Sequence, residues 1–169
     1  MDSKGDYPLI TIHYPLKRNA PIDMTAGYSG KPLSKKLGIT PGMIVITVDA
    51  PDDYSDLVRP LPDDVLIIDA DGRASARAKS SSGPADLVHL FTNSRDDLFR
   101  LLAEFKNLIK QDGIIWVSWY KRAAKLPTEI TEDTVREAAL PIGLVDVKVC
   151  AVDDNWSGLK LVIRKENRK

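Results

Sequence analysis

Polar and charged side chains follow the predicted strands at the points where a parallel sheet commonly binds its ligand. Asn93 and Ser94 follow one strand and open the most regular helix pattern in the chain, and Lys121 and Arg122 follow the next strand. The carboxyl edge of an open α/β sheet is its usual ligand-binding edge, and helix N-termini attract anions. The sequence therefore predicts a site for a small anionic ligand at this edge, with these candidate residues: Asp49, Asn93, Ser94, Trp119, Lys121, Arg122, Tyr28 and Ser29.

Several of these candidates also have an interpretation that needs no ligand. Ser94 suits a helix N-cap, because its hydroxyl can accept a hydrogen bond from the first turn. Lys121 and Arg122 suit solvated surface charges, and Trp119 suits the packed core. The sequence leaves both interpretations open.

Metal and nucleophile chemistry receive little support from the residue types. His89 lies in a predicted buried strand and His13 lies far away near the N-terminus, so with one cysteine they do not form a metal site by sequence. We expect His89 to be a hydrogen-bonded structural residue and Cys150 an inert core thiol. The chain has neither a Gly-x-Ser-x-Gly elbow nor a phosphate-binding loop. No metal and no identifiable catalytic residue are expected.

Composition excludes some classes of partner and compartment. The 169 residues carry 24 basic and 24 acidic side chains, so the formal net charge is zero and gives no electrostatic footprint for nucleic acid or an anionic membrane. A local basic patch stays compatible with that balance. No apolar run approaches the roughly 18 residues that span a bilayer, and the polar N-terminus does not resemble a signal peptide. With a single cysteine, the expected location is the cytoplasm.

Continuous apolar runs predict strands that are buried on both faces, which is typical of a parallel sheet. We expect the last two strands to form an antiparallel hairpin, because the connection between them is short. The fold class is therefore α/β, with a Rossmann-like, mostly parallel sheet and a C-terminal antiparallel hairpin. The predicted strands are 43–48, 65–68, 86–91, 114–119, 144–152 and 159–163.

Helices and termini complete the predicted organisation. Ser94 caps a helix whose apolar stripe continues to Ile109, with Asp112-Gly113 as its end, and Thr131 caps a second helix. Residues 69–84 are predicted to be a surface loop. The predicted domain is 31–164, with a C-terminal tail over 165–169.

The N-terminal residues 1–30 are predicted to form an extension or arm, with a short strand near residues 9–14. We expect this arm to bring Tyr28 and Ser29 over the binding edge, although an aromatic residue followed by Ser-Gly is also ordinary turn chemistry. Trp156 in the hairpin loop is expected to pack on the arm or on another subunit, and a homo-oligomer is one consequence.

Three stretches carry a resemblance to a known fold. They are Leu37 to Val45, Ala85 to Phe91, and Leu108 to Val117. They resemble the approach to the first strand, the fourth strand, and the fifth strand of class I S-adenosylmethionine-dependent methyltransferases. This resemblance implies a Rossmann-like sheet, and it makes Asp69 or Asp71 a match for the acidic residue that holds a ribose in those enzymes.

The first strand departs from the methyltransferase pattern at its end. Those enzymes have a glycine-rich turn there, which lets the backbone approach the cofactor. This chain has Asp49-Ala50-Pro51-Asp52-Asp53 instead, so it offers no glycine, loses a backbone donor at Pro51 and adds negative charge. No cofactor is therefore expected, and S-adenosylmethionine is the minor alternative.

Other stretches resemble an uncharacterised bacterial family of small proteins, which brings no activity with it. They are Ala26 to Leu33, Leu37-Gly38-Ile39, Trp119 to Arg122, and a run from Leu140 to Leu159. The matching parts of that run are Leu140-Pro141, Lys148 to Asp153 and Trp156 to Leu159. We expect a methyltransferase-like domain that acts as a non-catalytic binding or regulatory module for a small anion. The alternatives are an atypical S-adenosylmethionine-dependent methyltransferase and a partner-binding protein without a small ligand.

Overall fold

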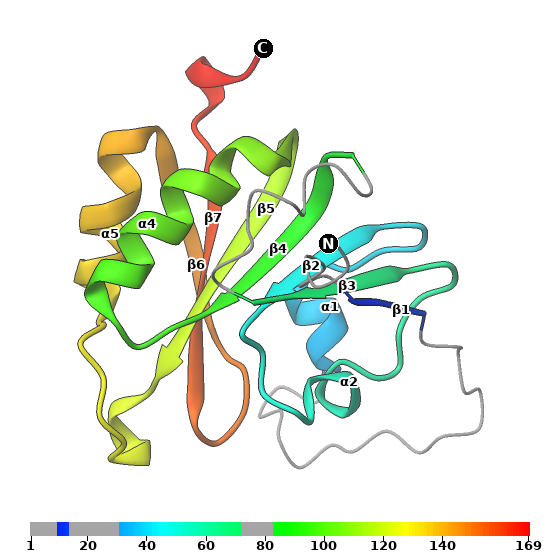
Figure 1. Cartoon of the computed structure of the whole chain (residues 1–169), viewed down its shortest axis with the longest axis horizontal. Coiled ribbons are helices and arrows are strands. Elements are labelled where there is room, and N and C mark those ends of the chain that lie inside the picture. The colour runs from blue at the N-terminus through cyan, green and yellow to red at the C-terminus, as the bar shows by residue number, and fades with distance from the viewer. Residues whose placement is uncertain (1–9, 14–30, 72–82) are drawn as a thin grey trace, which may run out of the picture.

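The described part of the chain forms a seven-stranded sheet with helices on both faces. The computed structural model describes residues 10–13, 31–71 and 83–169. Within these residues the strand order is β1-β3-β2-β4-β5-β7-β6 (Figure 1). None of the helices in these ranges is long and apolar enough to cross a membrane.

Four parallel strands form the middle of the sheet, which confirms the prediction from the apolar runs. They are β2 (Ile44–Val48), β3 (Leu66–Ala70), β4 (Ala85–Phe91) and β5 (Ile109–Tyr120). Strand β2 lies at the centre, with β3 on one side and β4 on the other. The sheet is therefore doubly wound, and the strand order reverses at β2.

Antiparallel strands close both edges of the sheet. The short strand β1 (Ile10–His13) lies where the sequence predicts a strand near residues 9–14, and it pairs with β3. Strands β6 (Leu144–Ala151) and β7 (Trp156–Ile163) form the expected hairpin, and β7 pairs with β5. The C-terminal hairpin thus extends the parallel sheet, as the fold class requires.

Each face of the sheet is covered by its own pair of helices. The short helices α1 (Leu33–Leu37) and α2 (Tyr54–Leu57) pack on one face, which we call the α1–α2 face. The longer helices α4 (Arg95–Phe105) and α5 (Glu132–Ala139) pack on the other face. The indole of Trp116 on β5 donates a 2.9 Å hydrogen bond to the backbone oxygen of Leu37, and this bond ties α1 to the sheet.

The prediction that the helix after Ser94 continues to residue 109 is wrong. Helix α4 ends at Phe105, a 3₁₀ turn follows over Lys106–Leu108, and β5 already begins at Ile109. Ala85 pairs with Ile109 while Leu87 pairs with Ile114, so the residues between these two points bulge out of the ladder.

Gly113 lies in this bulge and does not end a helix. The backbone there is too closely packed for a side chain. A Cβ at Gly113 would lie 2.9 Å from the backbone oxygen of Lys110 and 2.9 Å from the Cβ of Ile109. The Asp112-Gly113 pair therefore belongs to the bulge of β5, although this pair of residues is also typical of a helix end.

Two further segments are placed only in part. The predicted loop over 69–84 begins later than expected, because Asp69 and Ala70 belong to β3, and residues 72–82 lie outside the described residues. Of the predicted arm, residues 1–30, the structure describes only β1. The predicted tail, 165–169, is exposed but contains a 3₁₀ turn over Lys165–Asn167.

Candidate functional site

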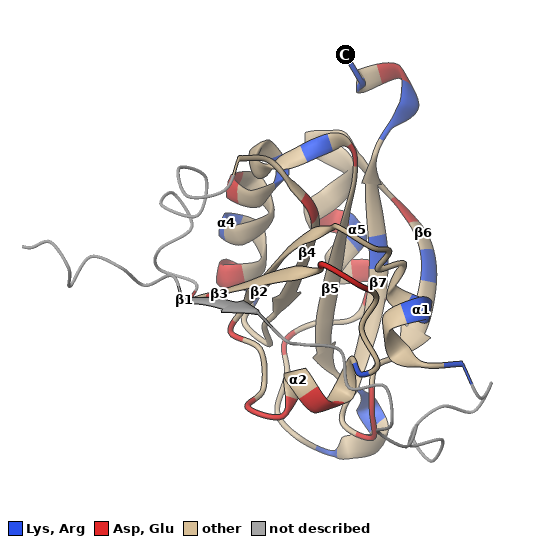
Figure 2. Ribbon diagram, turned by 90° about the vertical axis from the view of Figure 1, so that its right-hand side faces the viewer, with Lys and Arg blue, Asp and Glu red and all other residues tan. Residues whose placement is uncertain are grey.

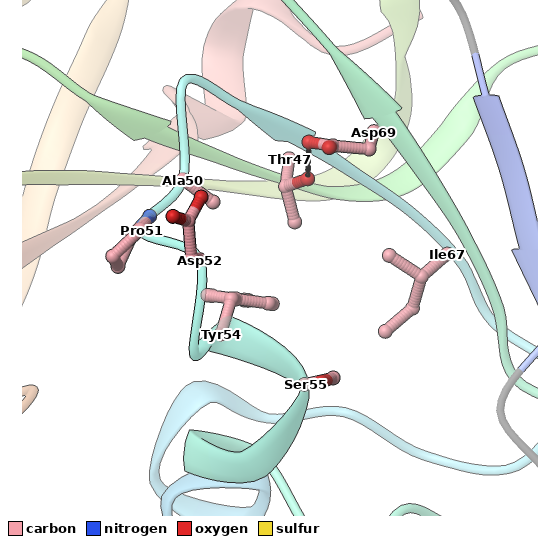
Figure 3. A pocket seen from close by; sticks show the side chains of 8 residues that line it. All are labelled: Thr47, Ala50, Pro51, Asp52, Tyr54, Ser55, Ile67 and Asp69. Carbon is pink, nitrogen blue, oxygen red and sulfur yellow. Dashed lines mark hydrogen bonds between the residues drawn. The ribbon is translucent and has the colours of Figure 1, made fainter.

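A small pocket lies at the carboxyl edge of the sheet, beside the point where the strand order reverses. Open α/β sheets bind ligands in the crevice outside this point. The pocket has a volume of about 150 Å³ and lies between β2, β3 and the segment that leads into α2 (Figure 3). Its lining residues are Thr47, Ala50, Pro51, Asp52, Tyr54, Ser55, Ile67 and Asp69.

The segment after β2 turns sharply off the sheet and forms one wall of this pocket. Asp49 adopts a left-handed backbone conformation, with φ of 56°, and its N–H donates to the backbone oxygen of Ala70 at 3.1 Å. The backbone oxygen of Pro51 then accepts from the N–H of Tyr54 at 3.0 Å, which starts α2. Asp49, a predicted site residue, is exposed and shapes this turn, but it does not line the pocket.

Oxygen atoms dominate the polar lining of the pocket. The hydroxyl of Thr47 donates a 2.8 Å hydrogen bond to a carboxylate oxygen of Asp69, and the two side chains lie on neighbouring strands in register. Asp52 and Ser55 lie on the opposite wall, in the segment leading into and through α2 (Figure 3). The lining contains two carboxylates and no lysine or arginine, so it suits a ligand that donates hydrogen bonds.

A buried chain of hydrogen bonds holds α2 against the sheet next to the pocket. The hydroxyl of Tyr54 lies 3.0 Å from Nδ1 of His89, and Nε2 of His89 lies 2.7 Å from Oγ of Ser118. His89 and Ser118 are fully buried. Burial lowers the pKa of His89 to about 3, because desolvation disfavours the imidazolium. His89 is therefore the hydrogen-bonded structural residue that the sequence predicts, and it stays neutral at physiological pH.

A cluster of aromatic side chains packs beside the pocket, near the carboxyl ends of β4 and β5. Phe91 stacks on His89 with ring centroids 4.2 Å apart and meets the edges of Tyr54 and Trp156 at 5.7 and 5.0 Å. The ring of Tyr120 lies 4.5 Å from Trp156. Trp156 thus packs on the domain's own aromatic residues. The expected contact with the N-terminal arm or another subunit stays a prediction.

The predicted anion site at the start of α4 is occupied by the chain's own carboxylate. Glu129 accepts a 2.7 Å hydrogen bond from the N–H of Arg95, in the first turn of the helix. Ser94 accepts from the N–H of Asp97 at 3.3 Å, so it has the capping role that the sequence left open. Asn93 accepts from the N–H of Tyr120 at 2.8 Å. Asn93 and Ser94 therefore join structural elements at this edge.

The remaining predicted residues that the structure describes do not meet at one site. Trp119 is only 6% exposed and packs in the core under α4 and α5, so it does not form a wall of the edge. The backbone N–H of Lys121 donates to the backbone oxygen of Asn155 at 2.9 Å, and Arg122 is exposed at the start of a 3₁₀ turn, Arg122–Ala124. Neither side chain lines the pocket. Tyr28 and Ser29 lie outside the described residues.

Sequence reasoning noted Asp52 and Asp69 but did not bring them together with Thr47 and Ser55. A usable signal was present in the strands. Thr47 and Asp69 are polar residues within otherwise apolar runs, and in strands side chains alternate between faces. Polar residues in buried strands require a partner or a function.

A family model for a protein of unknown function, DUF3052, matches residues 34–165. The chain belongs to this family. The match covers the four parallel strands, all the residues that line the pocket and the C-terminal hairpin. It confirms the predicted likeness to an uncharacterised family of small proteins. A search of curated proteins gave no match.

Solved structures show that the fold is that of methyltransferases. An S-adenosylmethionine-dependent methyltransferase from Aquifex aeolicus has a TM-score of 0.56 at 15% identity, over 78% of this chain and 87% of that one. TrmN from Thermus thermophilus has a TM-score of 0.50 at 14% identity, over 78% of this chain and 47% of that one. A fibrillarin pre-rRNA processing protein from Methanococcus jannaschii also has a TM-score of 0.50, at 9% identity, over 74% of this chain and 68% of that one. At these identities the likeness concerns the fold alone.

Proposed function

We propose that this domain is a non-catalytic binding or regulatory module with a methyltransferase-like fold. Its ligand occupies the pocket between β2, β3 and α2. The observation that supports this proposal is the aromatic cluster around Phe91, in which the chain's own side chains pack closely beside the strand-order reversal. A methyl donor and an acceptor would both need space at that point.

The segment after β2 adds a second argument against methyl transfer. Pro51 has no N–H to offer a cofactor, and the turn before it contains no glycine that would let the backbone approach a ligand closely. Asp52 lines the pocket and would repel the carboxylate of a methionine group.

The lining also bears on the class of ligand. The carboxylates of Asp52 and Asp69, with the hydroxyls of Thr47 and Ser55, favour a small molecule that carries hydroxyl groups or an ammonium group. The anionic ligand predicted from the sequence would need a different location. It would have to bind at the end of β5, next to Lys121 and Arg122.

Calorimetry and thermal shift on the full chain test the proposal. The ligand set consists of S-adenosylmethionine, S-adenosylhomocysteine, polyols, nucleosides, amines and acidic metabolites. The informative variant is Asp69→Asn, which keeps an acceptor for the Thr47 hydroxyl but removes the charge. Asp64→Asn is the matched control, because Asp64 is exposed, lies outside the pocket, and has a left-handed φ of 61° that asparagine tolerates.

We expect a hydroxyl- or ammonium-bearing ligand to bind the wild type and the control, and to lose affinity at least about tenfold in Asp69→Asn. Saturable micromolar binding of S-adenosylmethionine, with methyl transfer to any acceptor, would favour the methyltransferase alternative instead. Binding of an acidic metabolite that disappears in the Lys121→Ala, Arg122→Ala double variant would move the site to the end of β5.

A further inference from the structure

The C-terminal hairpin has a basic surface on the α1–α2 face. Along β7, residues Trp156, Gly158 and Lys160 share this face, because side chains alternate along a strand and Trp156 packs with the core under α1 and α2. Lys148 lies on the same face of β6, two residues before Cys150, which packs against the same core. Figure 2 shows basic positions of α1, β6 and β7 on this side of the molecule.

Two of these lysines lie directly opposite each other. Lys148 and Lys160 are partners in the β6–β7 register, so their Cβ atoms are about 5 Å apart, and like charges in this arrangement destabilise a sheet. Lys36 on α1 reaches the same area, because the charges of Lys36 and Lys148 both act on the thiol of Cys150.

Carboxylates do not neutralise this cluster within the described residues. Ion pairs there leave out Lys36, Lys148 and Lys160. Asp146, the nearest acid along β6, pairs with Arg136 of α5 at 3.0 Å. The chain therefore keeps three positive charges together at a cost in stability, although its net charge is zero.

A partly exposed aromatic ring continues the basic surface toward the carboxyl edge. Trp156 is four residues from Lys160 on the same strand face, a distance of about 13 Å, and Tyr120 lies beside it. Gly158 between them is buried, because the side chains of Trp116, Ser118 and Val152 pack over it. Lysines in line with an aromatic ring are the combination that single-stranded nucleic acids bind, with phosphates on the lysines and a base stacked on the ring.

We propose that the surface formed by Lys36, Lys148, Lys160 and Trp156 binds single-stranded nucleic acid without sequence specificity. The phosphates contact the three ammonium groups, and a base stacks on the indole of Trp156. This proposal is independent of the pocket, because these four residues lie outside its lining. An acidic protein segment would satisfy the lysines without stacking on Trp156, so quenching of Trp156 distinguishes the two partners.

Fluorescence anisotropy with labelled oligo-dT and oligo-U of about 12 nucleotides tests this surface. Three phosphate contacts predict a slope of log affinity against log salt of about −2. The Lys148→Ala, Lys160→Ala double variant should reduce that slope to about −0.7 and weaken binding about tenfold at low salt. The matched control is the Lys165→Ala, Lys169→Ala double variant, which removes the same charge at the exposed C-terminus.

Intrinsic tryptophan fluorescence gives a second readout. Trp116 and Trp119 are 0% and 6% exposed, so stacking by a base should quench mainly Trp156, and the quench should disappear in Trp156→Phe. Because the lysine double variant removes like charges that face each other, it should melt at or above the wild-type temperature.

Three results would overturn the proposal. The first is an absence of saturable binding at about 50 mM salt, where phosphate contacts are strong. The second is an equal loss of affinity in the C-terminal control. The third is binding of poly-glutamate that is as tight as oligonucleotide binding and leaves Trp156 unquenched, which would assign the surface to an acidic protein partner.

Discussion

Acidification should destabilise the fold through His89, in a pH range where carboxylates barely titrate. Burial lowers the pKa of His89 to about 3 in the folded protein, whereas an unfolded chain has a histidine pKa of about 6.5. Between these two values the unfolded state binds the proton and the folded state does not, so stability falls as pH falls. The contribution of neutral His89 is fully present above about pH 6.5 and is lost progressively below it.

The size of the effect follows from the same two values. Each pH unit below the unfolded pKa costs about 1.4 kcal/mol, so the step from pH 6.5 to pH 5 costs about 2 kcal/mol. The imidazole is fully buried and both ring nitrogens have hydroxyl partners, Tyr54 and Ser118, so water does not screen the effect. Aspartate and glutamate titrate mostly below pH 5 and add little in this window.

Urea unfolding followed by far-UV circular dichroism, at several pH values between 7.5 and 5, measures the predicted loss. His89→Gln is the reference variant, because glutamine can hydrogen-bond to the same hydroxyls but does not titrate. We expect the wild type to lose about 2 kcal/mol more than the variant over this range. Equal pH slopes in the two proteins would refute the reasoning, as would an imidazole NMR signal of His89 that titrates above pH 5.

Three further predictions concern contacts that the structure describes. Tyr54→Phe leaves a ring nitrogen of His89 without its hydroxyl partner and should cost about 2 kcal/mol, or about 4–8 °C in the melting temperature, whereas Tyr120→Phe at a partly exposed ring should change it by less than about 2 °C. Gly113→Ala should lower the melting temperature by a similar 4–8 °C, because the new Cβ meets backbone at 2.9 Å; an unchanged melting curve would contradict the tight bulge. Glu129→Gln should lower it by about 1–3 °C in low salt, with the difference shrinking in 1 M salt, since the carboxylate lies at the positive end of α4.

The sheet could be predicted from sequence because its signals are local. The apolar runs of β2, β4 and β5 are too hydrophobic for strands with a wet face, and the short predicted connection Asp153–Gly158 implies a hairpin. The structure begins β7 earlier, at Trp156. The end of α4 could not be predicted in the same way. Leu108 and Ile109 fit the helical stripe, and only the pairing of Ile109 with Ala85, 24 positions earlier, assigns it to a strand.

The candidate site depends on long-range pairing to a greater degree. The carboxylate that occupies the start of α4 is Glu129, 34 residues beyond its partner Arg95, and no local pattern connects the two. The pocket likewise exists because β2 and β3 are neighbours in the register that joins Thr47 to Asp69. The sequence indicates the carboxyl edge of the sheet, where the pocket lies, but the register decides which residues meet there.

The position of β1 has a consequence for truncation of the domain at its N-terminus. The stretch shared with the DUF3052 family begins at residue 34, yet the outer edge of β3 is paired by Ile10–His13. A chain cut at the family boundary would leave the N–H and C=O groups along that edge of β3 without partners. Such an edge is a template for a strand from another molecule, so the shortened protein should associate or aggregate more than the longer one. A synthetic peptide that contains residues 10–13 would then act as a donor strand, and its addition should reduce this added association.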